Sequence, residues 1–482
     1  MKNVHLIAAC GVGMASLAGM LKEKGFRVTG SDANVYPPMS TQLSSLGIML
    51  RSPYAAENIP EDADLVIVGN AVTRDNPEAK EAVRLGLPAL SMPRAVADFF
   101  LEGKENVVVA GTHGKTTITS LLAWSLFALG ADPSFLVGGI PKNFPVSYRL
   151  GGGRHFVIEG DEYDTAYFDK GPKFLHYRPR IALLTSIEFD HADIYRDLPH
   201  CKESFRKFVR IVPEDGLLIA SIDYPDVVEV ARDAVCPVLY YGVGEEGAAQ
   251  PGVDLWRVGF LPDEGEFSRF RMERGGEAHD FCLRLPGRHN AGNAAAAALA
   301  LFRLGYPADR VAAAFAGFEG VRRRQEVVGE IGGVLVIDDF AHHPTAVRET
   351  IRAIRERYPG RPVTAVFEPR SNTSRRKIFQ GEFARALSGA DSVILAGVFG
   401  AEKFPPEDRL DPAEVVNVVR ESGREARYVE EVDRIVEYLS AEARAGDLIL
   451  IMSNGAFGGI QGKLARALET RSIVPPVPGK NP

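Results

Sequence analysis

Seven consecutive residues have the composition of a phosphate-binding loop, Gly111-Thr112-His113-Gly114-Lys115-Thr116-Thr117. Glycines let backbone amides approach phosphate oxygens, a lysine reaches the outer phosphates, and a threonine hydroxyl can ligate Mg²⁺. We therefore expect the segment to bind a nucleoside triphosphate. The general pattern G-x-x-x-x-G-K-[ST] would place a glycine where this chain has Val109, and the shorter form is typical of a narrower group of enzymes.

The residues around the loop predict the elements that must position it. The apolar run 107–110 predicts a strand, and 118–129 predicts a helix that begins just after the loop. A strand, a glycine loop and a helix in this order are the context in which such a loop binds phosphate.

A carboxylate at the end of a second strand supplies a candidate metal ligand. Residues 156–159 form an apolar run that ends in Glu159, within the segment Glu-Gly-Asp-Glu-Tyr-Asp. An acidic oxygen beside a phosphate loop suits Mg²⁺. We expect Asp161 and Asp164, in contrast, to lie in a solvated loop.

His191 follows another apolar run, 181–187, within Asp190-His191-Ala192-Asp193. A histidine here could be a general base, a metal ligand or an ordinary loop residue. Its place at a strand end and its acidic neighbours favour a role at a metal site.

Two later segments could contact the nucleotide. Asn290 and Asn293 lie one helical turn apart at the start of a predicted helix, so they can hydrogen-bond an adenine edge or cap the helix. Asp338 and Asp339 follow a buried strand and are candidates for nucleotide contacts. The adjacent histidines after them would not share a helix face, so we do not expect a two-histidine metal site there.

The whole chain reads as an α/β protein in three segments, 1–105, 106–320 and 321–482. Each alternates apolar strands with helices, and 253–285 alternates apolar and polar residues like an antiparallel hairpin inserted in the second segment. The third segment has predicted strands at 334–337, 363–367, 392–396 and 448–452.

The first segment predicts a Rossmann-like site for one nucleotide-like ligand. Gly11 and Gly13 follow the first strand, but Ser16 stands where a dinucleotide turn would have its third glycine. Asp32 ends the second strand, where it can contact a ribose or a base. Asn70 and Arg74 follow a further strand, and we expect them to contact the same ligand.

The composition of the chain disfavours some kinds of binding partner. The 482 residues carry a net charge of −7, which argues against nucleic acid or an anionic membrane as the main partner. The four cysteines form no CxxC pair and fit a reducing cytosol. The longest apolar run, 294–302, is too short to span a bilayer. We expect a cytoplasmic monomer or weak homodimer with no nucleic acid and no membrane partner.

No guanine-binding N-K-x-D motif is present, which disfavours a GTPase. The chain instead resembles the Mur ligases, ATP-dependent enzymes that form amide bonds in bacterial cell-wall precursors. The resemblance covers nearly the whole length and rests on a shared set of motifs: GTHGKTT at 111–117, EGDEYD at 159–164, DHADIY at 190–195, GRHNAGN at 287–293, RRR at 322–324 and DDFAHHPT at 338–345.

Other segments are similar to the branch of that family that ligates peptides. They are SDANVYPPMS at 31–40, DTAYFDK at 164–170, EPRSNT at 368–373 and MSNG at 452–455. The resemblance implies an ATP- and Mg²⁺-dependent ligase that joins the tripeptide L-alanyl-γ-D-glutamyl-meso-diaminopimelate to UDP-N-acetylmuramate through an acyl phosphate. Such a reaction belongs to peptidoglycan synthesis and recycling.

The resemblance also implies roles for individual residues. Catalytic residues would be Lys115, Glu159 and His191; metal ligands Thr116, Glu159 and His191; ATP contacts residues 111–117, Asn290, Asn293, Arg323 and Asp339; substrate contacts Gly11, Gly13, Asp32, Asn70, Arg74, Arg370, Asn372 and Asn454. Some family members carry a carbamylated lysine after the histidine. Arg206 lies near that place here, so we do not predict the modification.

Three alternatives remain at this point. The first is the sister ligase that adds L-alanine to the same nucleotide. The second is a folylpolyglutamate-type ligase, which is disfavoured because a nucleotide-type segment precedes the phosphate loop. The third is an ATP-binding protein without ligase activity, which would need the amine site to be vacant although Arg370, Asn372 and Asn454 lie at predicted strand ends.

Overall fold

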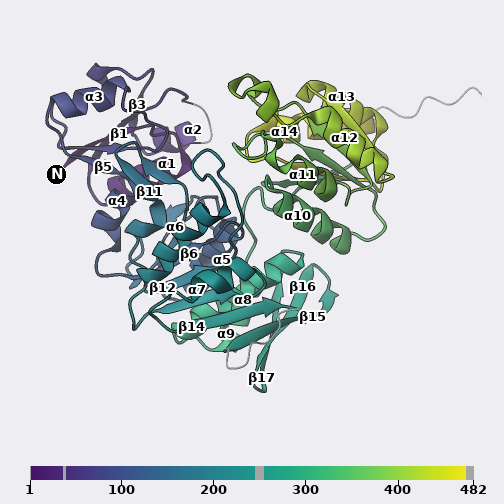
Figure 1. The fold of residues 1–482 in the computed structure, drawn as a ribbon, viewed down its shortest axis with the longest axis horizontal. Helices are drawn as coiled ribbons and strands as arrows, with labels where there is room; N and C mark the ends of the chain where they lie inside the picture. The colour runs from purple at the N-terminus through teal and green to yellow at the C-terminus, as the bar shows by residue number, and fades with distance from the viewer. Residues whose placement is uncertain (1, 36–38, 245–253, 474–482) are drawn as a thin grey trace, which may run out of the picture. The chain divides into compact units, whose positions relative to one another are not determined.

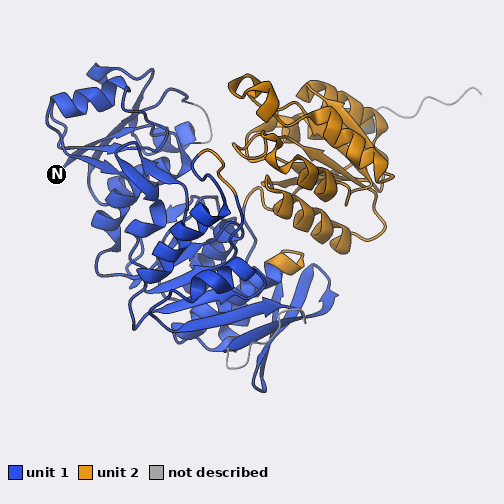
Figure 2. Ribbon diagram, viewed as in Figure 1, with its two compact units in different colours: residues 1–189, 194–284, 290–321 blue, residues 190–193, 285–289, 322–482 orange. Residues whose placement is uncertain are grey.

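A computed structural model describes residues 2–35, 39–244 and 254–473. Tyr36 to Pro38 of the SDANVYPPMS motif, and residue 253 at the start of the predicted insert, lie outside the described residues. Contacts divide the chain into two compact units (Figure 2). The first contains residues 1–189, 194–284 and 290–321, and the second contains 190–193, 285–289 and 322–482.

The first sheet of unit 1 is parallel and is drawn in purple and blue in Figure 1, with strand order β3-β2-β1-β4-β5. Its strands are β1 Asn3–Ile7, β2 Arg27–Ser31, β3 Met49–Arg51, β4 Leu65–Val68 and β5 Ala89–Ser91. Its helices are α1 Val12–Glu23, α2 Met39–Ser45, α3 Pro77–Arg84 and α4 Met92–Val96. This confirms the Rossmann-like alternation. The topology reverses direction at β1, which places the loops after β1 and β4 at the edge where ligands of such sheets bind.

Ser16 shows why the glycine pattern stops short. Its side chain is fully buried, and its hydroxyl donates to the Val12 carbonyl at 2.8 Å and lies 2.8 Å from Ser147 Oγ. The serine thus ties α1 to the segment just before β8, a contact that a third glycine could not make.

The second sheet of unit 1 has the order β17-β16-β15-β14-β13-β12-β6-β9-β7-β8. Its strands are β6 Glu105–Ala110, β7 Ser134–Leu136, β8 Tyr148–Arg149, β9 His155–Gly160, β12 Ile181–Leu184, β13 Leu217–Ser221, β14 Val238–Val243, β15 Leu255–Glu264, β16 Phe267–Arg274 and β17 Glu277–Leu283. A separate antiparallel pair joins β10 Asp164–Ala166 to β11 Asp169–Pro172. The helices are α5 Lys115–Ala128, α6 Leu198–Arg210, α7 Pro225–Ala231, α8 Arg288–Arg303 and α9 Ala308–Ala316.

The predicted hairpin insert is part of this sheet rather than an appendage. Strand β15 pairs in parallel with β14, and β16 and β17 continue from it in antiparallel fashion. Residues with alternating polarity therefore extend the central sheet at one edge, where one face of each strand is covered.

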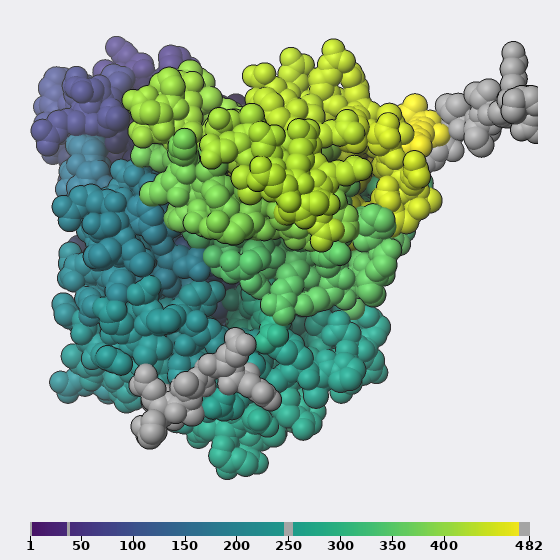
Figure 3. All heavy atoms as spheres, turned by 45° about the vertical axis from the view of Figure 1, so that its right-hand side comes forward, coloured from purple at the N-terminus to yellow at the C-terminus, as the bar shows by residue number. Residues whose placement is uncertain are grey.

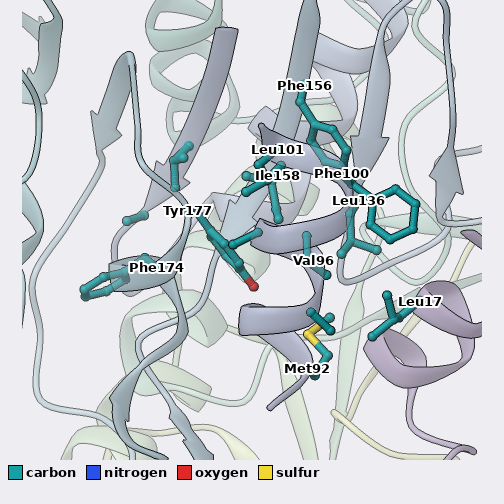
Figure 4. Packing of buried hydrophobic residues seen from close by; sticks show 14 of the residues in the cluster. Leu17, Met92, Val96, Phe100, Leu101, Leu136, Phe156, Ile158, Phe174 and Tyr177 are labelled. Carbon is teal, nitrogen blue, oxygen red and sulfur yellow. The ribbon is translucent and has the colours of Figure 1, made fainter. Parts of the chain in front are cut away.

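One apolar core crosses from the first sheet of unit 1 into the second. Leu17 of α1, Val96 of α4, Phe100 and Ile158 of β9 belong to the same buried cluster. Figure 4 shows the side chains around α4 that take part in it. The segment that links the two sheets is therefore packed between them instead of forming an exposed linker.

Unit 2 is built on a sheet of order β18-β19-β23-β20-β21-β22. Its strands are β18 Glu326–Ile331, β19 Val334–Asp339, β20 Val363–Phe367, β21 Ser392–Ala396, β22 Glu425–Val429 and β23 Leu448–Met452. Its helices are α10 Pro344–Arg357, α11 Gln380–Leu387, α12 Pro412–Glu421, α13 Val432–Glu442 and α14 Ile460–Ile473.

Both faces of this sheet are covered. Alternate strand residues pack either with α10, α11 and α12 or with α13 and α14, in two separate apolar clusters. Residues from about 322 onward, which make up most of unit 2, are drawn from green to yellow in the space-filling view (Figure 3). The three sheets confirm the predicted α/β architecture. Among the described residues, none of the helices combines the length and apolar character that crossing a membrane would need.

Candidate functional site

The predicted phosphate loop joins β6 to α5, as the sequence indicated. Gly111 has φ +127° and Gly114 has φ +81°, backbone conformations that favour glycine. A Cβ atom on Gly111 would lie 2.2 Å from Thr185 Oγ1. The loop is therefore closed too tightly for any other residue at position 111.

Residues after β12 hold this loop, and the sequence analysis missed them. The Thr112 amide donates to the Ser186 carbonyl at 2.9 Å, and the His113 amide donates to Ser186 Oγ at 2.9 Å. The Glu188 amide donates to Thr112 Oγ1 at 2.8 Å, and the Glu188 carboxylate lies 3.0 Å from His113 Nε2. Only their position after a buried strand next to β6 could have indicated this role.

Thr116 and Glu159, the two predicted metal ligands of unit 1, are brought together. Strands β6 and β9 are parallel neighbours, with Val109 opposite Glu159. Thr116 Oγ1 donates to Glu159 Oε1 at 3.0 Å, and the Gly138 amide donates to Glu159 Oε2 at 2.7 Å. A hydroxyl and a carboxylate at the start of a phosphate-loop helix are hard oxygen donors that fit Mg²⁺.

Lys115 is paired with Glu162, a residue that the sequence analysis did not single out. Its Nζ lies 2.8 Å and 3.0 Å from the two Glu162 carboxylate oxygens, and 2.6 Å from the Gly111 carbonyl. Burial alone would lower the pKa of Lys115, but the carboxylates of Glu162 and Asp161 raise it above its ordinary value. The lysine is therefore held as a cation.

Asp161 and Asp164 are less solvated than expected. Asp161 forms an ion pair with Lys173, and Asp164 pairs with Lys170 at 2.9 Å. The side chains of Asp161 and Asp164 keep exposed fractions of 35% and 26%. The lysine partners give both aspartates a structural role in this loop.

Asn290 and Asn293 face the phosphate loop from α8. The helix begins at Arg288, so neither asparagine is its first residue. Asn293 Nδ2 donates to Asn290 Oδ1 at 3.2 Å, and a Cβ atom on Gly114 would lie 2.3 Å from Asn293 Oδ1. This close approach favours nucleotide contacts over helix capping for the pair.

The predicted nucleotide residues of the first sheet follow the carboxyl ends of its strands. Asp32 accepts hydrogen bonds from the Cys10 amide at 2.8 Å and the Asn34 amide at 3.0 Å. It thereby connects the loops after β1 and β2. Asn70 and Arg74 are exposed just after β4, on the other neighbour of β1.

Gly11 and Gly13 lie at the start of α1 in the same region. A Cβ atom on Gly13 would lie 3.1 Å from the end of the Met92 side chain, whereas one on Gly11 would meet nothing within 4 Å. The backbone at Gly11 is thus open to a ligand.

In unit 2, Arg323 lies just before β18, and Asp339 is the last residue of β19. Arg323 has φ +60°, its Nε donates to Asp338 at 3.0 Å, and its Nη2 donates to the Ser453 carbonyl at 2.7 Å. Asp339 accepts bonds at 2.7 Å from the amides of Gln325 and Ala341. Burial raises the pKa of Asp339 above its ordinary value. Asp339 therefore shapes the loop that carries Arg323, and its contact with ATP stays a prediction.

Arg323 and Asp338 also line a cavity of about 440 Å³ together with Glu326 and Gln461. Gln461 Nε2 donates to Asp338 Oδ1 at 3.0 Å across its wall.

Arg370 is held flat at the carboxyl ends of three adjacent strands. Its guanidinium carbon lies 3.8 Å from the centroid of the Phe399 ring, after β21. A Cβ atom on Gly455, after β23, would lie 1.9 Å from Arg370 Nε. The guanidinium therefore stacks between an aromatic ring and bare backbone, while 25% of the side chain remains exposed.

The two asparagines predicted beside Arg370 differ in their surroundings. Asn372 Nδ2 donates to Asp193 at 2.8 Å, and Asn372 Oδ1 accepts from Arg375 at 2.5 Å, so both ends of its amide are engaged. Asn454 Oδ1 is buried and has no hydrogen-bond partner among the described residues. Asn454 is thus the better placed of the two to bind an N–H group of a ligand.

His191 belongs to unit 2, with φ +53°. Its amide donates to Asp190 Oδ1 at 2.7 Å, and Thr373 Oγ1 donates to the same oxygen at 2.5 Å. Burial would raise the pKa of Asp190, but the nearby histidines His191 and His342 bring it well below its usual range. The role of His191 as a metal ligand stays a prediction.

Arg206, on α6, forms ion pairs with two acidic residues. Its guanidinium pairs with Asp233 at 2.9 Å and with Glu229 at 2.5 Å on and beside α7. The residue near the place of the family's modified lysine therefore links two helices.

Three family models match this chain, one for each of its three large sheets. The model of the Mur ligase family, catalytic domain, matches residues 3–103. The Mur ligase middle domain matches 109–301, and the Mur ligase glutamate ligase domain matches 323–455.

Individual relatives extend over nearly the entire chain. The chain is 38% identical over 471 residues to the UDP-N-acetylmuramate–L-alanyl-γ-D-glutamyl-meso-2,6-diaminoheptandioate ligase of Escherichia coli (strain K12), covering 98% of this chain and 99% of that protein. It is 33% identical over 456 residues to the UDP-N-acetylmuramate–L-alanine ligase of Acetivibrio thermocellus, covering 94% and 93%.

A solved structure is similar over the same extent. The murein peptide ligase of Psychrobacter arcticus 273-4 matches with a TM-score of 0.73 and 33% identity, covering 97% of this chain and 99% of that one. The family models, the full-length relatives and the three sheets agree, and the chain belongs to the Mur ligase family.

Proposed function

We propose that this protein is an ATP-dependent ligase that joins L-alanyl-γ-D-glutamyl-meso-diaminopimelate to UDP-N-acetylmuramate. The muramic carboxylate attacks the γ-phosphorus of ATP, which forms an acyl phosphate and releases ADP. The peptide amine, having lost a proton, then attacks the acyl carbon. The amide bond forms and inorganic phosphate leaves, so the products are the amide, ADP and phosphate.

The hydrogen bond between Thr116 and Glu159 at 3.0 Å is the observation that carries the ligase activity. It joins the helix of the phosphate loop to a carboxylate on the neighbouring strand, next to Lys115. Mg²⁺ held there would neutralise charge between the outer phosphates. His191 would supply a second set of metal contacts.

Residues of this chain position the reactants and offset the negative charge of the phosphates. The amides of the phosphate loop and the N-terminus of α5 bind phosphate oxygens, and Lys115 binds the outer phosphates. Asn290 and Asn293 are proposed contacts of the nucleotide. Arg323 and Asp339 are carried over as ATP contacts from the family resemblance. Catalysis then rests on orientation and on preorganised positive charge.

Arg370 supports a peptide as the acceptor. A stacked guanidinium can hold a carboxylate in two parallel hydrogen bonds, and Asn454 Oδ1 can accept from an amide or ammonium N–H. The tripeptide carries several carboxylates and amides, whereas L-alanine carries one carboxylate. The highest-identity relative described above is also named for the peptide.

We place the nucleotide sugar on the first sheet and divide the chain into domains at 1–105, 106–320 and 321–482. Asp32, Asn70 and Arg74 contact the uridine nucleotide, and the backbone at Gly11 and Gly13 approaches its phosphates. The third domain binds the incoming peptide and part of ATP. The protein acts in the cytoplasm, where these precursors are made.

One assay tests this function. ADP release is measured with UDP-N-acetylmuramate and each of three acceptors: L-alanine, L-alanyl-γ-D-glutamate and the tripeptide. We expect the highest kcat/KM with the tripeptide. Relatives that add L-alanine share 33% identity over most of the chain, so a preference for L-alanine would assign that activity instead. No ADP release with any acceptor would refute a ligase.

A further inference from the structure

We propose that Glu162 is a positioning residue that competes with ATP for Lys115. Glu162 holds the lysine in the structure, and we infer that it gives the lysine up when the phosphates bind. This inference rests on the proposed ATP site. It adds that the Glu162 carboxylate binds the Lys115 ammonium in place of the phosphates.

The ion pair between these residues is shielded from water. The side chains of Lys115 and Glu162 are 12% and 3% exposed. Both carboxylate oxygens lie within hydrogen-bonding distance of Nζ, at 2.8 Å and 3.0 Å. A pair of this kind is strong because leaving either charge buried alone is costly.

The lysine has no donor left over for a phosphate in this arrangement. An ammonium group has three N–H donors. Here they face the two Glu162 oxygens and the Gly111 carbonyl at 2.6 Å, with the Thr112 carbonyl a further 3.4 Å contact. Lys115 must therefore loosen its hold on Glu162 before it can bind the outer phosphates.

Glu162 is fixed more firmly than the lysine that it holds. Its backbone carbonyl accepts a hydrogen bond from Tyr195 Oη at 2.7 Å, and Tyr195 is itself buried. The glutamate is carried between strands β9 and β10, whereas Lys115 reaches it with a long flexible side chain. We infer that the lysine moves and the carboxylate stays.

The neighbouring acid provides a matched control. Asp161 precedes Glu162 in the chain but forms its ion pair with Lys173. Removing its charge takes one negative charge from the same segment without breaking the Lys115 pair.

This competition has a consequence for turnover. Each entry of ATP breaks an internal ion pair, so binding is weaker than the phosphate contacts alone would make it. Each departure of ADP lets that pair form again, which favours product release. Glu162 would then lower nucleotide affinity and raise the rate of release.

The experiment is calorimetric titration of ATP and of ADP into wild-type protein, Glu162→Gln and Asp161→Asn, each with Mg²⁺ and with EDTA. We expect Glu162→Gln to bind both nucleotides roughly tenfold more tightly, with or without Mg²⁺, as the loss of one charge-assisted competitor predicts. The nucleotide-free variant should also unfold at a lower temperature. Asp161→Asn should bind like wild type.

A double-mutant cycle with Lys115→Ala isolates the pair. In the Lys115→Ala background, the Glu162→Gln substitution should give no gain in affinity. Should Glu162→Gln fail to fold, Glu162→Asp keeps the negative charge but shortens its reach, and it should show a smaller gain than tenfold.

Three results would overturn the inference. Weaker binding only in the presence of Mg²⁺ would make Glu162 a metal ligand. Unchanged binding would make the ion pair incidental, and an equal gain in the Lys115→Ala background would place the effect elsewhere. Wild-type protein that binds no ATP at all would instead refute the proposed function.

Discussion

Gly455 lies so close beneath the guanidinium of Arg370 that a methyl group on Gly455 would sit 1.9 Å from Arg370 Nε. No side chain can occupy that space while the arginine keeps its place. The Phe399 ring closes the opposite face at 3.8 Å. The planar guanidinium is thus held in one orientation, in which the N–H groups at its edge can donate to a planar carboxylate.

The first prediction is that Arg370→Ala raises the KM for the tripeptide by one to two decades. The reason is the loss of ~1.5–3 kcal/mol of charge-assisted hydrogen bonding. Gly455→Ala should act in the same direction because it displaces the guanidinium. Steady-state kinetics with varied tripeptide measure both. The KM for ATP should stay nearly constant, and the exposed Lys377→Ala on the same segment is the control; a matching rise there would remove the special role of Arg370.

The second prediction concerns Mg²⁺. Glu159→Ala and His191→Ala should each shift the Mg²⁺ dependence of turnover to higher concentration, since each would remove a proposed ligand of Mg²⁺. Turnover is measured across a Mg²⁺ titration, with Asp164→Asn as a control from the same acidic segment. Unchanged titrations in both variants would show that neither residue binds the metal.

The third prediction is that Lys115→Ala abolishes turnover while the protein stays folded. A cation aimed at developing phosphate charge contributes roughly 3–4 kcal/mol, or ~10²–10³ in rate. Single-turnover ADP formation measures the loss, and circular dichroism checks the fold. Retention of more than half of the activity would contradict the role of the phosphate loop.

The fourth prediction is that the first sheet binds UDP-N-acetylmuramate and not NADH. Ser16 fills the place of the third glycine and is committed to Ser147, so the dinucleotide turn is incomplete. Fluorescence titration with NADH should show no saturable binding, and Arg74→Ala should weaken binding of the uridine nucleotide. Tight NADH binding that the uridine nucleotide does not displace would reverse the assignment.

The fifth prediction concerns acid stability. Glu78 is fully buried in the first sheet, where it lies 3.1 Å from His5 Nε2, accepts from Asn58 at 2.7 Å and accepts from Ser31. Burial would raise its pKa, but hydrogen bonds from His5, Ser31 and Asn58 bring the pKa below its ordinary value.

Because the folded-state pKa is lowered, Glu78 stabilises the fold above the pKa of an unfolded glutamate, and that stability is lost as the pH falls through the folded pKa. Glu78→Gln should therefore cost about 1.5–3 kcal/mol at pH near 7, a difference that shrinks below pH ~4. Urea unfolding at both pH values measures it. The exposed Glu61→Gln should change little, and a pH-independent loss in Glu78→Gln would contradict the linkage.

The sequence predicted the elements around the phosphate loop closely because apolar runs and glycines act locally. Strands β20, β21 and β23 have the predicted bounds, and α5 begins only slightly earlier than predicted, at Lys115. The antiparallel hairpin predicted at 253–285 is confirmed by β15, β16 and β17, but its place in the sheet was not predicted. Alternating polarity predicts strands, but it does not say that β15 pairs with β14 instead of standing apart.

Within the site, the sequence predicted the metal ligands that belong to a recognisable motif. Thr116 and Glu159 meet because α5 follows strand β6 and Glu159 lies on its neighbour β9, which the strand-end pattern indicated. Glu162 and Ser186 were missed because their partners are set by tertiary contacts over many residues, and one more acid or serine in a polar segment has no local signature. Asn372 shows the reverse: the motif marked it, but its amide is engaged by Asp193 and Arg375.

The apolar core that crosses between the two sheets of unit 1 bears on how this enzyme could be recombined with its relatives. A chimaera joined near residue 105 would take α4 from one parent and the β9 face that it packs on from the other. Contacts such as Val96 with the cluster around Ile158 would then have to fit between two divergent sequences. Exchange of the first sheet and its helices therefore requires the facing residues of the second sheet to be exchanged with them, so the smallest transferable part is larger than the first Rossmann-like sheet.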